Sequence, residues 1–145
     1  MTRRASARRQ RGSASIELAV LTPAILAMFA MVIIAGRVNM ARQAMEAAAF
    51  DAARAASLSR TAGEAQTQAA AAANATLDAQ GLSCTDLTVV VLTGGFGVPV
   101  GQPATVTVNV ACQASFGDVA LPGMPGSATL TASFTSPLDT YRSRQ

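Results

Sequence analysis

Residues 18–35 read LAVLTPAILAMFAMVIIA, a run of eighteen residues without a charge. As an α-helix this run spans about 27 Å, close to the hydrocarbon thickness of a bilayer. A buried helix of a soluble protein is one alternative, but a chain of 145 residues offers little surface to enclose a helix that is apolar all round. A cleaved secretory signal is another, but the run is long and contains no A-x-A cleavage pattern. The run therefore predicts a transmembrane helix.

The charge distribution predicts how this helix is oriented. Five of the eleven arginines precede it, namely Arg3, Arg4, Arg8, Arg9 and Arg11. From residue 12 onward the chain has six arginines and eight carboxylates, a net charge of −2, so its basic character belongs to a short N-terminal tail. Basic tails can bind nucleic acid, but the positive-inside rule explains this one better. We expect a single-pass protein of the cytoplasmic membrane, with residues 1–12 in the cytoplasm, the C-terminal domain outside and no nucleic-acid partner.

The junction between the basic tail and the apolar run carries a recognisable motif. A glycine follows the arginines, and a carboxylate stands five residues later at the start of the apolar run. This order resembles the processing site of type IV pilin precursors. Within that superfamily the sequence is similar to the TadE-like proteins of tight-adherence pili. The matching residues are Arg11, Gly12, Ile16, Glu17 and Pro23, whereas Leu18 stands where the family often has Phe.

The resemblance implies a structural or assembly role. A prepilin peptidase would cut between Gly12 and Ser13, and the new amine at Ser13 would pair with Glu17 of the same or a neighbouring chain. The protein would then be a minor pilin or pseudopilin that enters or primes a surface filament. Its partners would be the peptidase, other pilin-like subunits, the assembly platform and membrane lipid. The alternative is a single-pass anchored binding module that recognises a ligand through residues 94–103.

The composition argues against an enzyme. The chain has no His and no Lys, which excludes a Ser-His-Asp triad, a Schiff-base lysine and a Walker lysine. Two cysteines without histidine cannot make a four-ligand zinc site. We therefore expect no catalytic residues, no metal and no cofactor.

Hydrophobic patterns predict an α+β, pilin-like fold for the rest of the chain. Residues 37–58 continue the first helix, and a second helix runs from a Thr61–Glu64 capping box to Ala79, with Gly81 as its stop. A stripe of small side chains on the first helix predicts packing against the rest of the domain or against neighbouring subunits; it comprises Val38, Ala41, Met45, Ala48, Ala52 and Ala55.

Three strands follow the helices, at residues 87–92, 104–112 and 127–135, and predict a small antiparallel sheet. Residues 94–103 and 122–126 are rich in Gly and Pro and predict a flexible hairpin loop and a linker. We expect a leader at 1–12, an assembly helix at 13–36, Ala-rich helices at 37–80, a β-rich domain at 81–136 and a fraying tail at 137–145.

The two cysteines, Cys84 and Cys112, lie on the side expected outside, where a disulfide is permitted. If Leu92 opposes Ala104 across the hairpin, the residue numbers of every opposed pair add up to 196. The numbers of the two cysteines also add up to 196, so the cysteines would face each other. This register places Val89 and Val91 on the threonine face, so a bulge or a slip of one residue is an alternative. The spacing predicts a Cys84–Cys112 disulfide.

Overall fold

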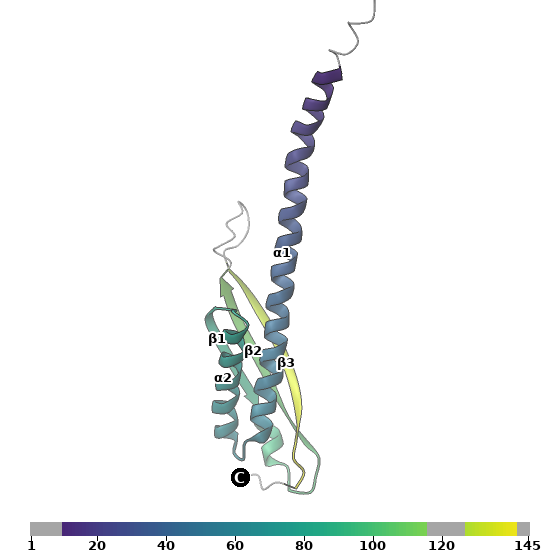
Figure 1. Cartoon of the computed structure of the whole chain (residues 1–145). Coiled ribbons are helices and arrows are strands. Elements are labelled where there is room, and N and C mark those ends of the chain that lie inside the picture. The colour runs from purple at the N-terminus through teal and green to yellow at the C-terminus, as the bar shows by residue number, and fades with distance from the viewer. Residues whose placement is uncertain (1–9, 116–126, 142–145) are drawn as a thin grey trace, which may run out of the picture. The chain divides into compact units, whose positions relative to one another are not determined.

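The computed structural model describes residues 10–115 and 127–141, with side chains from residue 16 onward. The elements in chain order are α1 (Gln10–Leu58), α2 (Ala62–Ala79), β1 (Cys84–Leu92), the 3-10 helix η1 (Thr93–Gly97), β2 (Ala104–Ser115) and β3 (Ser127–Leu138). Figure 1 shows these elements along the chain. The predicted α+β fold, with a long N-terminal apolar helix, a second helix and a three-stranded antiparallel sheet, is confirmed.

The chain divides into two compact units, residues 1–39 and residues 40–145. In the first unit the described residues all belong to α1. They are mostly Ala, Leu, Met and Ile, which fit a helix, and Pro23 is the only proline inside it. The second unit contains the remainder of α1 and every other element.

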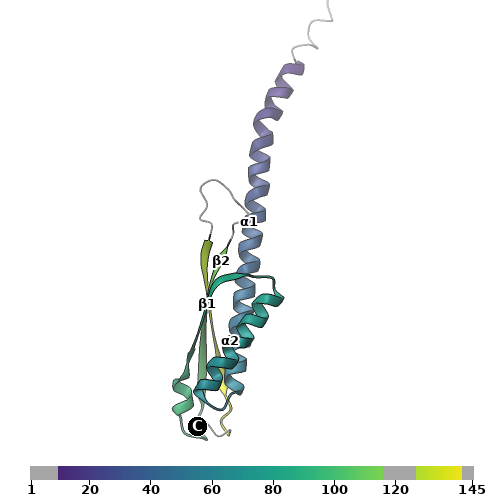
Figure 2. The same cartoon turned by 90° about the vertical axis from the view of Figure 1, so that its left-hand side faces the viewer.

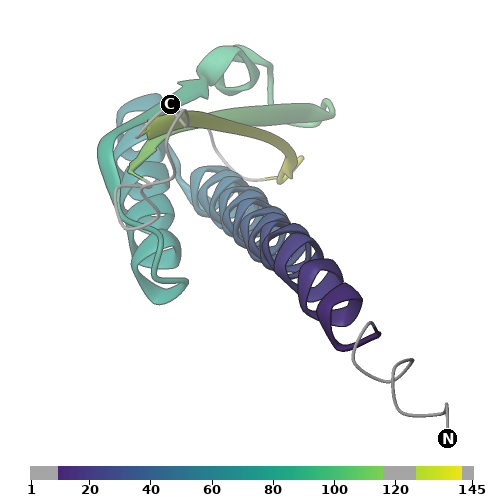
Figure 3. The ribbon, with the colours of Figure 1, turned by 90° about the horizontal axis from the view of Figure 1, so that it is seen from above.

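In the second unit the helices cover one face of the sheet, as Figures 2 and 3 show from two directions. Alanine makes the helical side of the core. Seven alanines have no exposed surface: Ala48, Ala52, Ala53, Ala56, Ala65, Ala69 and Ala73. The sheet contributes the inward row of β2, in which Val106, Val108, Val110 and Cys112 are at most 1% exposed. The small-residue stripe expected on the first helix therefore packs mainly inside its own domain, the first of its two predicted roles.

The turn between the helices closes with side-chain hydrogen bonds. The Thr61 hydroxyl accepts from the Glu64 amide at 3.1 Å, as the predicted cap requires. The Glu64 carboxylate accepts from the amide of Arg60 at 3.1 Å, one residue before the amide that a standard capping box would satisfy. At the far end of α2, Gly81 has a φ of +70°, the left-handed conformation expected of a helix stop.

The strands are longer than predicted, and the predicted register of the first hairpin is wrong. Leu92 pairs with Thr107 and Val89 with Val110, so opposed residues sum to 199 instead of 196. An odd shift reverses the faces of a strand. Val91 therefore faces the core at 8% exposure, whereas Val90 is 47% exposed. This register removes the conflict that the sequence had left at Val89 and Val91.

The cause of the shift lies in the connection between β1 and β2. Residues 94–103 are not simply the flexible loop expected, because η1 forms within Thr93–Gly97 and buries Phe96 in the core. The backbone of Gly95 lies against the carbonyl of Thr105, where a side chain would collide. η1 thus occupies the edge of β2 beside residues 104–106, and β1 stops pairing at Thr107.

The C-terminal end also differs from expectation. β3 continues to Leu138, which is only 5% exposed, so the expected fraying does not begin at residue 137. The predicted linker at 122–126 lies outside the described residues, as do residues 142–145 of the tail.

Candidate functional site

The exposed apolar surface of α1 is the most unusual feature of the first unit. No residue from 16 to 38 is buried, and the side chains of Ile16, Val20 and Met31 are 68%, 68% and 71% exposed. Leaving such side chains in water forfeits about 1.5–3 kcal/mol each relative to an apolar environment. By length and composition α1 is able to cross a membrane, and none of its most apolar stretch is buried within the described chain. A buried core helix is therefore the wrong description of this segment.

Glu17 and Pro23 both lie within this apolar helix. Glu17 is exposed. Pro23 has no N–H, so the carbonyl of Ala19 loses its usual helical donor. One residue earlier the Thr22 hydroxyl donates to the Leu18 carbonyl at 2.6 Å, a bond that keeps this hydroxyl satisfied in an apolar setting.

The predicted processing site lies at the start of α1. Gly12 and Ser13 have helical backbone, and Ser13 and Glu17 are separated by four residues, the spacing that places two side chains on one face of a helix. The side chains of residues 10–15, including Arg11, lie outside the described part, as do Arg3, Arg4, Arg8 and Arg9. Processing and orientation therefore remain predictions.

In the second unit Cys84 and Cys112 form a disulfide with Cα atoms 5.4 Å apart. The pairing was predicted, but the geometry differs from the prediction. Cys84 opposes Ala114, and Cys112 opposes Leu87, so the bond runs diagonally across the ladder. A bulge between Cys84 and Asp86 inserts one extra residue and turns Cys84 onto the core face that Cys112 shares.

The extra residue of the bulge is Thr85. Its hydroxyl donates to the carbonyl of Gln113 at 2.8 Å, which ties the bulged segment to β2. The sequence pattern offers the bulge only as an alternative, because an odd residue in a strand leaves no periodic signal of its own.

Gln66 on α2 holds the outer edge of β1, and no sequence signal identifies it. Its Nε2 donates to the Val89 carbonyl at 2.7 Å, and its Oε1 accepts from the Val91 amide at 3.1 Å. The side-chain amide thus satisfies two backbone groups that a neighbouring strand would otherwise satisfy. The α2 helix is also linked to a carboxylate of α1, since the Thr76 hydroxyl donates to Asp51 at 2.8 Å.

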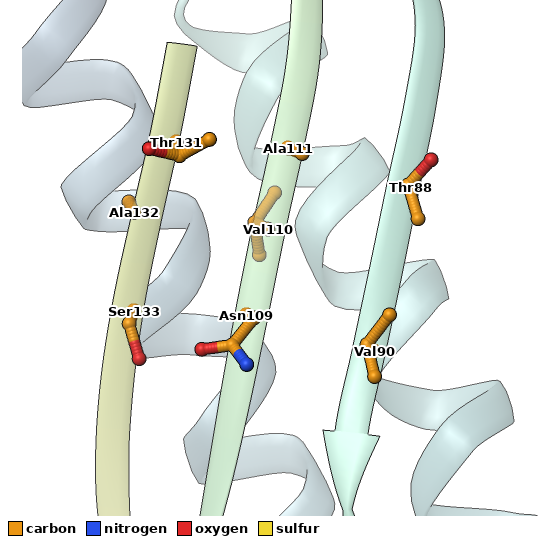
Figure 4. Close-up of a pocket in the computed structure, with 8 residues that line it drawn as sticks. All are labelled: Thr88, Val90, Asn109, Val110, Ala111, Thr131, Ala132 and Ser133. Carbon is orange, nitrogen blue, oxygen red and sulfur yellow. The ribbon is translucent and has the colours of Figure 1, made fainter.

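The face of the sheet turned away from the helices contains a shallow hollow of about 320 Å³. Figure 4 shows Ala111 between Thr88 and Thr131, with Asn109 in the adjoining row. The lining side chains are uncharged, so the hollow has no acid, base or nucleophile pair of the kind that catalysis requires. Within the described residues no three His, Cys, Asp or Glu side chains lie close enough to hold a metal ion.

The N-terminal part of the chain is similar to a known protein family. Residues 12–54 match a family described as TadE-like protein. The matched segment includes the exposed apolar helix and ends before α2 and the sheet. No curated protein and no solved structure matches the chain.

Proposed function

We propose that the protein, whose residues 12–54 are similar to the TadE-like family, takes part in assembling a tight-adherence pilus as a minor pilin or pseudopilin. The single observation that carries the proposal is that the matched segment contains the whole exposed apolar stretch of α1. A helix that is apolar on every side and unburied suits lipid before assembly and neighbouring subunit helices afterwards. The disulfide-linked second unit would then be the extracytoplasmic domain.

The proposed maturation step is cleavage between Gly12 and Ser13 by a prepilin peptidase. Removing residues 1–12 deletes all five N-terminal arginines and leaves six arginines against eight carboxylates. It also creates a positive amine at Ser13, one helical turn before Glu17. The basic leader that orients the precursor is thereby replaced by a single charge with an acidic residue within reach.

Glu17 is proposed to act after this cleavage. In a low-dielectric environment an amine and a carboxylate attract much more strongly than in water, and pairing offsets the cost of burying either charge. Pairing within one chain would neutralise the helix end. Pairing between chains would in addition set the longitudinal offset of one subunit helix against the next.

The processing step is tested by the Gly12→Leu variant. We expect its leader to remain attached, because a bulky side chain fills the space that the peptidase needs at the scissile bond. Mass spectrometry of membrane-extracted protein would show a wild-type chain starting at Ser13 and a variant that retains residues 1–12. Gly36→Leu is the matched control, since Gly36 lies on the same helix with open space around it. Normal maturation of Gly12→Leu would refute the proposed site.

The role of Glu17 is tested by Glu17→Gln, with Asp78→Asn, which likewise turns one exposed carboxylate into an amide but on α2, as the control. Losing a charge-assisted hydrogen bond costs about 1.5–3 kcal/mol, so we expect roughly tenfold or greater loss of assembled protein. Membrane insertion should be unchanged in both variants, as measured by carbonate extraction. Assembly of Glu17→Gln at the wild-type level would refute a role of Glu17 in assembly and leave it as an acidic residue near the start of the helix.

The same mass spectrum separates this proposal from a plain anchored binding module, which would keep its basic tail. The structure weakens the case for that alternative, which depends on residues 94–103 forming an open ligand-binding loop. Phe96 is buried in η1, so part of residues 94–103 packs into the core and is not open to a ligand.

A further inference from the structure

The two edges of the sheet are protected to different degrees. The strand order is β1-β2-β3, so β1 and β3 form the edges. At the β1 edge, Gln66 occupies the backbone groups of Val89 and Val91, and the bulge at Thr85 interrupts the ladder. Side-chain caps and bulges are ordinary ways of blocking further strand addition.

The β3 edge has neither device. Its twelve residues, Ser127–Leu138, pair with β2 without a register shift and contain no charged side chain. Within the described chain β2 is the only strand paired with β3. Pro137 stands near the end of the strand and leaves the preceding residues able to donate and accept. A long, regular, uncharged edge is a template for an added strand.

A cavity of about 260 Å³ adjoins this edge on the helix-covered face. It lies between α1 and β3 and is lined by Arg42, Met45, Glu46 and residues 129–131. Arg42 and Glu46 are exposed and make no ion pair in the described chain. A strand added beside β3 would direct alternate side chains to this face, where an amide can accept from the guanidinium and donate to the carboxylate.

We propose that the β3 edge binds an extended segment of a different pilin-like subunit, by strand addition, with an Asn or Gln side chain in the cavity at Arg42 and Glu46. The inference rests on the proposed function, because it takes the partner from the same assembly.

A second copy of this chain is the rival occupant. Residues 127–133 read SATLTAS in both directions, so two antiparallel β3 strands centred on Leu130 would match every cross-strand pair. In that arrangement, however, residues 40–58 of the two α1 helices would run in opposite directions, because each lies lengthwise beside its own β3 (Figures 1 and 2). Two helices that enter one membrane must run the same way. A second copy in the same orientation would have to offer its β1 edge, which Gln66 occupies.

Site-specific photo-cross-linking of the full chain in cells tests the proposal. A photoreactive amino acid replaces Thr131 at the open edge or, as the matched control, Thr88 at the capped edge. The two residues flank Ala111 in one row of the outer face, so they differ chiefly in which edge strand of the sheet carries them. We expect an adduct from position 131, mapped by mass spectrometry to an extended, Asn- or Gln-containing segment of another pilin-like subunit, and at least about tenfold less from position 88.

A second pair of variants measures the requirement for an open edge. With the cross-linker at Ser133, Thr131→Lys should lower the adduct yield by about tenfold, because an edge lysine opposes strand addition, whereas Thr88→Lys should not. Formation of the Cys84–Cys112 disulfide in both variants verifies folding. A synthetic peptide of the mapped segment should slow amide exchange in β3 of the detergent-solubilised chain.

Three results would overturn the inference: no adduct at position 131, equal adducts at both positions, or an adduct to a second copy. The N-terminus is read from the same samples. Processing at Ser13 without the position-131 adduct refutes this inference alone, whereas the adduct on an unprocessed chain refutes the proposed maturation alone.

Discussion

Replacing both cysteines of the disulfide with alanine should destabilise the second unit by about 3.5 kcal/mol. The bond joins residues 28 apart in sequence, and the loop-closure relation gives about that free energy for a loop of this length. Alanine is the appropriate replacement because Cys112 has no exposed surface, and serine would bury a hydroxyl in its place. A loss of this size is a large fraction of the roughly 5–15 kcal/mol that stabilises a typical domain.

The assay is urea unfolding of the full-length protein in detergent, followed by circular dichroism in the β-sheet region. The free energy of unfolding of the Cys84→Ala, Cys112→Ala double variant is compared with that of the wild type, with and without reductant. Reductant should lower the stability of the wild type towards that of the variant and leave the variant unchanged. A difference below about 1 kcal/mol between the oxidised wild type and the variant would refute the loop-closure argument.

Two further substitutions test the packing of the second unit. Ala69→Leu should cost about 1–3 kcal/mol, because Ala69 has no exposed surface between the helices and the sheet, whereas Ala71→Leu on the exposed side of α2 should change the unfolding free energy by less than about 0.5 kcal/mol. Gly95→Ala should also cost about 1–3 kcal/mol, because its Cβ would collide with the Thr105 carbonyl, and Gly97→Ala, which meets open space, is its control. Thermal unfolding of the four variants measures both comparisons, and equal midpoints within either pair would contradict the packing described for it.

The sequence predicts those parts of the fold that local patterns encode. The charge-free run at residues 18–35 identifies the exposed helix, and the Thr61 cap and Gly81 stop give the ends of α2 closely. Alternation of Val with Thr identifies β2 and its inward face. Each of these signals depends on residues within a few positions of one another.

The errors arise where distant residues decide the structure. The register of β1 against β2 depends on Phe96 entering the core and on Gly95 reaching Thr105, neither of which has a periodic signal. The disulfide was predicted from a register that differs from the observed one by three residues, and the bulge at Thr85 places both cysteines on the same face of the sheet. Gln66 could not have been singled out, because its two partners lie 23 and 25 residues away in the sequence.

The position of the disulfide has a consequence for the order of events in biogenesis. In the proposed topology Cys84 and Cys112 reach an oxidising compartment only after the chain has crossed the membrane. Before that, the β1–β2 hairpin is held by backbone pairing and packing alone, and a chain still in the cytoplasm lacks the whole contribution of the bond. In that topology the precursor would unfold at a lower cost while it is threaded through a translocation channel, and the covalent link would then make the translocated domain harder to unfold. The proposed topology would thus place export before stabilisation, through a single pair of cysteine side chains.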